Sequence, residues 1–198
     1  MKFPLAIQNL IDQFSRLPSV GPKTAQRYVF YLLRQPAEEL QKLAQFIAEL
    51  KEKTITCSRC LSLAESNPCP ICADKKRQAD IICIVANTQD MLTLEATRQY
   101  NGLYHVLGGL INTIEEVKPE QLNIKQLINR IEKDGIKEII LALNPTVEGE
   151  TTAMYLVKLL KPYKIKITKL ARGLPSGADL EYADEITLAN ALKYRNEL

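Results

Sequence analysis

The sequence has 198 residues, enough for one large domain or a few small ones. Apolar residues make up 46% of the chain and charged residues 25%, as in an ordinary globular protein. No apolar run approaches the roughly 20 residues that cross a bilayer, and residues 1–4 lack the apolar core of a signal peptide. These features argue against a membrane protein and predict a location in the cytoplasm.

The formal net charge of +3 is distributed unevenly. Residues 1–56 carry eight Lys and Arg against five Asp and Glu, and residues 57–78 carry four against two. Residues 79–198 carry fourteen against sixteen. A phosphate backbone would therefore bind most readily to the first third of the chain and the cysteine segment that follows it. A surplus of this size also fits a plain solvated surface, so it does not decide the function.

Residues 1–53 predict a module of three short helices. Apolar residues at helical spacing indicate the first helix over about 5–16. Pro18 interrupts it, Pro22 suits the first position of the second helix, and Pro36 opens the third. Because such helices make only a small core, we expect them to pack on each other and on a partner subunit. The predicted buried stripe of the third helix consists of Leu40, Leu43, Ala44, Ile47 and Leu50.

The turn between the first two helices has features of a phosphate-binding site. Gly21 supplies a permissive backbone, and the free N–H groups that follow it favour a phosphate oxygen flanked by Lys23 and Arg27. Residues 17–25 resemble the helix-hairpin-helix motif, which binds the DNA backbone without sequence specificity. Ser19 stands where that motif has its first glycine. The alternative is a plain helical hairpin with a capped turn.

Four of the five cysteines form two C-x-x-C pairs that are eight residues apart. This spacing is typical of a tetrahedral four-cysteine zinc site, with sulfur about 2.3 Å from the metal. Four protein ligands leave no open position, so the pattern predicts one structural Zn²⁺. Two disulfides are the alternative, which the absence of a secretory signal disfavours. The predicted ligands are Cys57, Cys60, Cys69 and Cys72.

From residue 80 onward strands alternate with helices. A continuous apolar run at 81–85 is typical of a strand buried on both faces of a parallel sheet, and 138–143 is a second such run. Residues 164–170 alternate as in an edge strand. The pattern predicts a mostly parallel α/β sheet with right-handed crossovers. The other expected elements are a strand at 103–107 and helices at 88–98, 124–131, 153–160 and 183–196.

Three features of the predicted α/β region bear on chemistry. Cys83 lies within a strand and is interpreted as a small buried hydrophobe outside the metal site. His105 has no nearby nucleophile or carboxylate in sequence and is interpreted as a packed strand residue rather than a catalytic one. Residues 144–150 follow a buried strand, where open α/β sheets place their ligands.

The order of these elements is similar throughout to the RecR family of bacterial recombination mediators. The resemblance covers essentially the whole chain. It rests on the four cysteines and on the strings at residues 21–27, 102–109, 144–150 and 172–182. It implies a helix-hairpin-helix module at 1–53, a zinc finger at 54–78, a Toprim-like α/β domain at 79–172, and a C-terminal loop and helix at 173–198 that contact another subunit.

The Toprim likeness brings an expectation about catalysis. Toprim enzymes hold Mg²⁺ with a Glu after the first strand and a later Asp-x-Asp pair. Here Ala86 and Asn87 follow the first strand, while Asn144 and Thr146 follow the later one. Without at least two carboxylates little remains to hold the metal. The sequence therefore predicts a catalytically silent Toprim fold.

The resemblance implies a non-catalytic mediator of DNA repair. Such proteins form ring-like oligomers, here expected as a tetramer or a dimer of dimers. With RecO or RecF they help load RecA onto single-stranded DNA. Gly21, Lys23 and Arg27 are the predicted DNA contacts, and Glu148 and Glu150, on an expected exposed loop, are the predicted partner contacts.

Two other functions stay open at this point. One is a metal-dependent Toprim nuclease or nicking enzyme, and the other is a scaffold that binds only proteins. The cysteine segment has room for only eight residues between its pairs, too few for a recognition helix. We expect it to act as a zinc-stapled joint between the helical and α/β modules.

Overall fold

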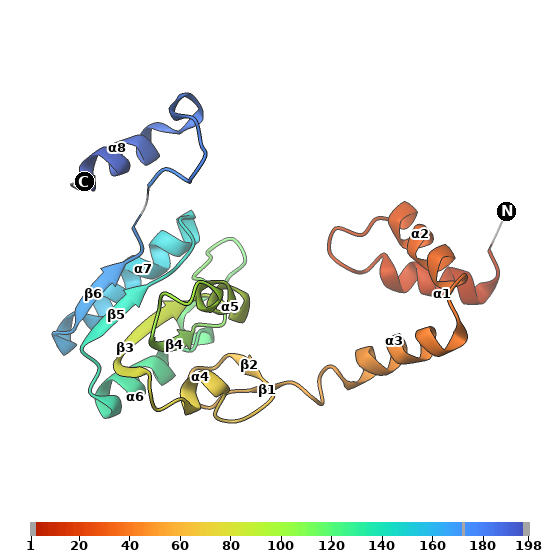
Figure 1. Cartoon of the computed structure of the whole chain (residues 1–198), viewed down its shortest axis with the longest axis horizontal. Helices are drawn as coiled ribbons and strands as arrows, with labels where there is room; N and C mark the ends of the chain where they lie inside the picture. Colours follow the sequence, from red (N-terminus) through yellow and green to blue (C-terminus); the bar gives the residue numbers. More distant parts are fainter. Residues whose placement is uncertain (1–2, 172, 196–198) are drawn as a thin grey trace. The chain divides into compact units, whose positions relative to one another are not determined.

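The computed structural model describes residues 3–171 and 173–195 (Figure 1). Arg172, the first residue of the string at 172–182, lies outside the described residues. The chain forms two compact units, residues 1–54 and residues 55–198. The cysteine segment belongs to the second unit.

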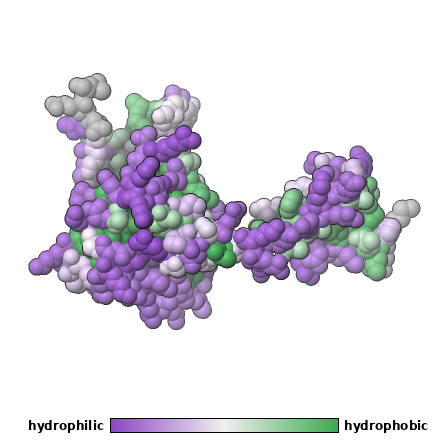
Figure 2. All heavy atoms as spheres, turned by 60° about the horizontal axis from the view of Figure 1, so that its bottom comes forward, coloured by the Kyte–Doolittle hydropathy of each residue, from purple (hydrophilic) through white to green (hydrophobic). Residues whose placement is uncertain are grey.

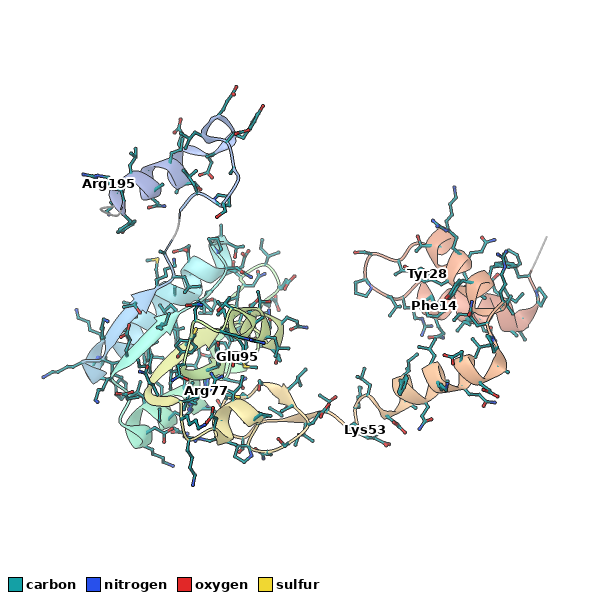
Figure 3. The ribbon with its side chains drawn as sticks, viewed as in Figure 1. Phe14, Tyr28, Lys53, Arg77, Glu95 and Arg195 are labelled. Carbon is teal, nitrogen blue, oxygen red and sulfur yellow. The ribbon has the colours of Figure 1, made fainter. Side chains whose placement is uncertain are left out.

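The first unit contains three helices: α1 (Leu5–Phe14), α2 (Pro22–Leu32) and α3 (Ala37–Glu49). Its small core consists of Ile11, Ala25 and Val29, which are buried between α1 and α2. The rings of Phe14 and Tyr28 meet edge to face at 6.0 Å (Figure 3). The three predicted helices are therefore present.

Within the single chain the predicted stripe of α3 is not buried, and its expected packing on a partner subunit stays a prediction. No residue of α3 is buried, and Ile47 and Leu50 are 62% and 65% exposed. Together with α1 and α2, four residues of the stripe line an open apolar groove of about 330 Å³: Leu40, Leu43, Ala44 and Ile47. Figure 2 shows apolar side chains reaching the surface of this unit. A unit this small has too little interior to cover every apolar face.

The second unit begins with the cysteine segment, which folds into a short two-stranded sheet followed by one helical turn. Strand β1 (Ile55–Thr56) pairs antiparallel with β2 (Leu63–Ala64), and α4 (Pro70–Ala73) is a single helical turn. We refer to residues 55–73 as the finger. Its elements are too short for hydrophobic periodicity to reveal them.

A four-stranded sheet forms the centre of this unit. Its strands are β3 (Gln78–Val85), β4 (Gly102–Val106), β5 (Glu138–Leu141) and β6 (Lys166–Lys169). The order is β4-β3-β5-β6 and every pairing is parallel, as predicted. The chain moves from β3 to β4 on one side and then returns to β5 on the other. The sheet therefore has a topological switch point beside β3, where such folds place ligands.

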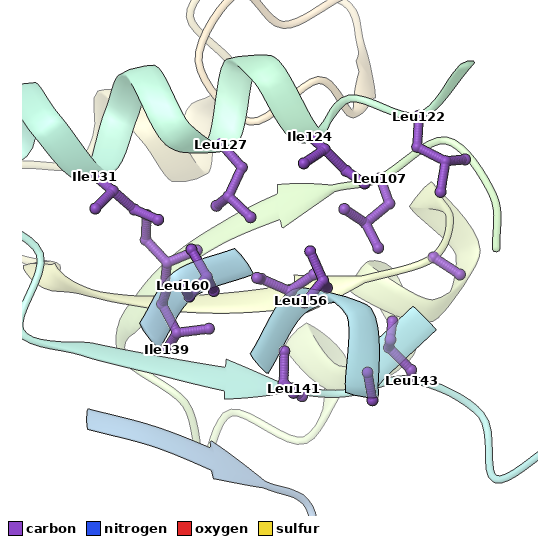
Figure 4. Close-up of a cluster of buried hydrophobic side chains, with 14 of the residues drawn as sticks. Leu107, Leu122, Ile124, Leu127, Ile131, Ile139, Leu141, Leu143, Leu156 and Leu160 are labelled. Carbon is purple, nitrogen blue, oxygen red and sulfur yellow. The ribbon is translucent and has the colours of Figure 1, made fainter. Parts of the chain in front are cut away.

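Helices cover both faces of the sheet. The larger core packs α6 (Ile124–Asp134) and α7 (Val147–Leu160) against one face, with Leu127 and Leu156 fully buried (Figure 4). Helix α5 (Thr88–Ala96) covers the other face, where Cys83 is buried. In the part of the chain that the structure describes, the remaining helix is α8 (Glu185–Lys193), and 3₁₀ turns lie at Pro119–Gln121, Lys161–Tyr163 and Leu180–Tyr182. Within the described ranges no helix combines the length and the hydropathy needed to cross a bilayer.

The expected loop at 144–150 is wrong, because helix α7 already begins at Val147. Glu148 and Glu150 therefore lie in its first turn. The Thr146 side chain caps this helix by accepting a hydrogen bond from the Gly149 amide at 3.2 Å. A Cβ atom at Gly149 would lie 1.9 Å from the Asn144 carbonyl oxygen, so the close approach requires glycine. A glycine that permits tight packing had looked like a loop residue.

The finger packs directly on the α/β part of the unit. Strand β4 is at one edge of the sheet, and on its outer side the Val106 amide donates to the Cys60 carbonyl oxygen at 2.8 Å. The Leu63 amide donates to the Thr88 hydroxyl at 3.1 Å. Ile71 contacts both the cysteines and the core beneath α5. The finger is thus an integral part of this edge of the sheet.

Candidate metal centre and nucleic-acid interface

The four predicted metal ligands come together. All four cysteines are buried, and their Sγ atoms lie within 4.8 Å of one another. The Sγ atoms of Cys60 and Cys69 are 3.6 Å apart. Sulfur atoms at about 2.3 Å from a tetrahedral ion would be separated by about 3.8 Å. The residues therefore fit one metal ion with four sulfur ligands.

Backbone geometry at each C-x-x-C pair turns the thiols inward. After Cys57 the chain reverses, with Leu61 at φ +64° and its amide donating to the Cys57 carbonyl oxygen at 3.0 Å. In the second pair, Cys69 caps the helical turn that carries Cys72, whose amide points to the Cys69 sulfur at 3.4 Å. The Cys69 amide points to the Cys57 sulfur at 3.3 Å. Amides directed at sulfur favour thiolates and fix metal ligands in place.

The electrostatics of the cluster also suit a cation. A hydrogen bond from the Cys72 thiol lowers the pKa of Cys60 to about 4. The same contact with Cys60, together with burial and the charges of the other thiolates, raises the pKa of Cys72 far above its usual range. One thiolate thus forms readily, whereas further ionisation is opposed by like charge. A bound cation removes that opposition and allows all four sulfurs to become ligands.

Cys83 and His105 take no part in this site. Burial raises the pKa of Cys83 to about 12, and its sulfur lies outside the cysteine cluster. His105 is fully buried, with Nε2 at 2.9 Å from the Asn123 carbonyl oxygen, and burial lowers its pKa to about 4. Both are packed strand residues, as predicted.

The predicted DNA contacts lie at the amino end of α2. Gly21 precedes the helix, Pro22 is its first residue, and no side chain caps it. The first-turn amides therefore have no acceptor from within the helix. Lys23 and Arg27, four residues apart on one exposed face, belong to none of the ion pairs among the described residues. Cationic side chains thus flank a helix end that already favours an anion.

Ser19 preserves the turn despite replacing the motif's first glycine. Its φ of +63° lies in the left-handed region that glycine adopts most easily. Gly21, in contrast, is extended at φ −80°, and a Cβ there would meet nothing within 4 Å. Neither conformation nor crowding requires glycine at position 21. Its missing side chain leaves open space beside the first-turn amides.

The strand ends that carry metal-binding acids in Toprim enzymes are used differently here. The Asn87 side chain accepts a hydrogen bond from the Asp90 amide at 2.8 Å and caps α5, as Thr146 caps α7. Asn144 is exposed nearby, beside a hollow of about 290 Å³ that Asp90 also lines. Among the described residues, the cysteines are the one group of three or more His, Cys, Asp or Glu placed to share a metal ion.

The two predicted partner contacts differ in their surroundings. Glu150 Oε2 lies 2.7 Å from Lys169 Nζ on β6, so this carboxylate is held by an ion pair. Hydrogen bonds from its own backbone amide and from Thr146 lower the pKa of Glu148. The two carboxylates give the start of α7 a negative surface.

The three basic residues at 75–77 differ in their contacts. Arg77 Nη1 donates to Glu95 Oε2 and to the Gly102 carbonyl oxygen, each at 3.1 Å (Figure 3). Lys75 and Lys76 are exposed. Arg77 therefore connects the start of β3 to α5 and β4.

Sequence reasoning missed one buried cation, Arg130 on α6. It follows Leu127 by three residues and so shares that residue's inward face, which is the signal that could have revealed it. Its side chain donates to the Tyr104 carbonyl oxygen at 2.7 Å.

Comparison with known proteins covers nearly the whole chain. Three family models match: "RecR, helix-hairpin-helix" at residues 7–51, "Toprim domain" at 80–171 and "RecR, C-terminal" at 173–196. Recombination protein RecR of Bifidobacterium longum subsp. infantis is 53% identical over 192 residues, which are 97% of this chain and 96% of that protein. This chain belongs to the RecR family. The RecR proteins of Gloeobacter violaceus and Moorella thermoacetica are 52% and 50% identical, covering 98% and 100% of both partners.

Membership of the RecR family confirms the resemblance seen in the sequence. The RecR helix-hairpin-helix match contains Lys23 and Arg27, and the Toprim match spans the parallel sheet. In the sequence, the four cysteines fall between these two matched regions.

Proposed function

We propose that this protein is a non-catalytic, DNA-binding mediator of recombinational repair. The observation that carries the proposal is the amino end of α2, which no side chain caps and which Lys23 and Arg27 flank. Its RecR relatives are named recombination proteins, which agrees with a role on DNA. Amides and cations of this kind contact phosphates, so binding is nearly blind to sequence.

The double variant K23A/R27A tests this interface. We expect its affinity for single-stranded and duplex DNA to fall at least about tenfold, and the slope of log affinity against log salt to decrease by roughly two. The matched control is K42A/K53A, which loses the same charge from two exposed lysines paired with Glu39 and Glu49. The control should bind DNA within about twofold of the unmodified protein. Equal binding by both double variants would remove Lys23 and Arg27 from the interface.

A single structural Zn²⁺ is the metal we propose for the cysteine cluster. Four thiolates in tetrahedral array suit zinc, and a site closed by four protein ligands stabilises the fold rather than acting on substrate. Elemental analysis of the purified protein should find one zinc per chain. Cys→Ser at any of the four ligands should lower zinc content and stability before it lowers DNA binding.

The apolar groove of the helical unit supports self-association. Phe46 is 67% exposed on α3, beside the apolar residues that line the groove. We propose that copies of the chain cover such surfaces in a ring-like tetramer or dimer of dimers. A single charged substitution, F46E, should then lower the mass measured in solution by light scattering. An unchanged mass would remove this face from the assembly.

The proposed partners are RecO and RecF in the cytoplasm, with RecA loading on single-stranded DNA as the outcome. The negative start of α7, carrying Glu148 and Glu150, is a candidate docking site for a basic partner surface. Loss of partner capture in E148A/E150A with DNA binding intact would support this assignment. Unchanged capture would remove both residues.

A Toprim nuclease is disfavoured by the chemistry of the strand ends. Asn87 and Thr146 act as helix caps where such an enzyme has metal-binding acids. Purified protein should therefore leave DNA and RNA intact in Mg²⁺ or Mn²⁺. Robust cleavage would overturn the non-catalytic role.

A further inference from the structure

Arg130 is a buried cation with unusual surroundings. It is 8% exposed, and it is the one buried residue with a formal charge within the described ranges. Removing a guanidinium from water costs several kcal/mol unless nearby groups compensate its charge and satisfy its N–H groups. Arg130 therefore needs a partner of opposite charge.

The protein groups around Arg130 compensate it only in part. Nη1 donates to the Tyr104 carbonyl oxygen at 2.7 Å. Nε lies 3.7 Å from Asp134 Oδ2, within ion-pair range but beyond a hydrogen bond. Nε and Nη2 are both buried and find no hydrogen-bond acceptor among the described residues.

Contacts on two sides connect this guanidinium to the finger that carries the cysteines. On β4, Tyr104 accepts from Arg130, and two residues later the Val106 amide donates to Cys60. At the end of α6, Asp134 also pairs with Arg59 of the finger at 3.4 Å. Arg59 in turn donates to the Cys72 carbonyl oxygen at 3.4 Å.

The electrostatics of Arg130 agree with that placement. Burial lowers the pKa of its guanidinium, whereas negative charge at the cysteine cluster and at Asp134 opposes that shift.

We propose that Arg130 is the counter-ion of the metal-bound cysteine cluster and positions its ligands from outside the finger. A divalent ion with four thiolates carries a net charge of −2, and this site is shielded from water. The guanidinium offsets part of that charge, and its contacts with Tyr104 and Asp134 connect it to the finger that carries the ligands, in the manner of an outer-shell partner. Metal binding thereby depends on α6 of the α/β domain as well as on the four cysteines. The inference rests on the proposed metal site.

The test uses the full chain and two substitutions at one position. R130M removes the charge and keeps much of the length, whereas R130K keeps the charge. K133M, at an exposed position of the same helix, is the matched control. Zinc affinity is measured by chelator competition, and Co²⁺ reconstitution gives thiolate charge-transfer absorption as a second readout.

We expect R130M to bind zinc about 10- to 100-fold more weakly, with a shifted Co²⁺ charge-transfer band. R130K should stay within about threefold of the unmodified protein, and K133M should not change. A folded R130M that binds zinc as tightly as the unmodified protein would overturn the proposal. So would equal losses of unfolding midpoint with and without chelator, since a merely structural arginine would matter equally in both states.

Two further outcomes are decisive. Should R130M fail to fold, R130K decides, because a loss above about tenfold in folded R130K would show that charge is not what matters. If the unmodified protein takes up no zinc or Co²⁺, the metal site itself fails and the role of Arg130 falls with it. If the unmodified protein binds metal and the Arg130 variants bind it equally tightly, the metal site is supported and the role proposed for Arg130 is refuted.

Discussion

The amino ends of α2 and α7 have the same backbone feature and opposite chemistry. Both helices start after a tight turn, and both present first-turn amides at the positive end of a helix dipole. No side chain caps α2, and Lys23 and Arg27 follow. Thr146 caps α7, and Glu148 and Glu150 occupy its first turn. One end is left open to an anion, whereas the chain itself neutralises the other.

This contrast shows that the amino end of a helix can bind an anion when no side chain of the protein caps it or neutralises its dipole. Helix α5 repeats the closed arrangement, with Asn87 as cap and Asp90 in the first turn. Both closed ends lie where an α/β sheet would ordinarily hold a ligand. The polar residues there stabilise helices, and the open end lies in the small helical unit.

The largest expected effect distinguishes the glycines at the two helix ends. G149A places a Cβ 1.9 Å from the Asn144 carbonyl oxygen, so we expect a loss of about 3 kcal/mol in the free energy of unfolding. G21A meets nothing within 4 Å and should change that free energy by less than about 0.5 kcal/mol. Denaturant unfolding of both variants measures the difference. Equal losses would mean that the two turns are not built as described.

A second prediction is that acid lowers the stability of the second unit through His105, which the first unit lacks. Burial lowers the pKa of His105 from 6.5 to about 4. Between these values the unfolded chain binds more protons than the folded one, so stability falls as the pH drops from about 7 to 4, by roughly 3 kcal/mol. The effect belongs to residues 55–198, because His105 is the one histidine of the chain.

The matched variant for this prediction is H105Q, whose side-chain amide can still donate to the Asn123 carbonyl oxygen. It should lose less stability than the unmodified protein over the same pH range. The comparison cancels the effects of thiolate and carboxylate protonation, which both proteins share. Parallel pH profiles would show that His105 is not the group that titrates.

The smallest stability change exchanges the character of the two helix ends. G21D gives α2 a capping carboxylate, so we expect a gain of a few tenths of a kcal/mol in stability. The same carboxylate should weaken DNA binding by at least about tenfold, because it occupies the amides and repels phosphate. T146A removes the cap of α7, should cost about 1 kcal/mol and should leave DNA binding unchanged. A G21D variant that binds DNA normally would refute the open end as the contact.

Much of the fold followed from patterns that local physics dictates. The apolar run at 81–85 predicted a buried central strand, and β3 is that strand with three further residues at its start. The cysteine spacing predicted the cluster because two residues between thiols fix their separation. Helical spacing likewise found α2, since its apolar stripe covers α1.

What escaped prediction depended on tertiary contacts. Gly149 falls within the loop expected at 144–150, yet it serves the close approach of Asn144 to the start of α7. Arg130 carried no prediction, yet it is buried here. The helical unit alone leaves the apolar stripe of α3 uncovered. A local sequence pattern cannot predict these tertiary contacts.

The hydrogen bond from Val106 to Cys60 has a consequence for aggregation. An unpaired sheet edge can recruit another chain by adding a strand. At β4 the finger backbone already takes up a donor of that edge. At β6, the opposite edge, Lys166 and Lys169 supply the charges that commonly deter such pairing. Loss of the finger would therefore expose an uncharged edge around Tyr104, and a protein stripped of its metal risks growing intermolecular sheet from that side.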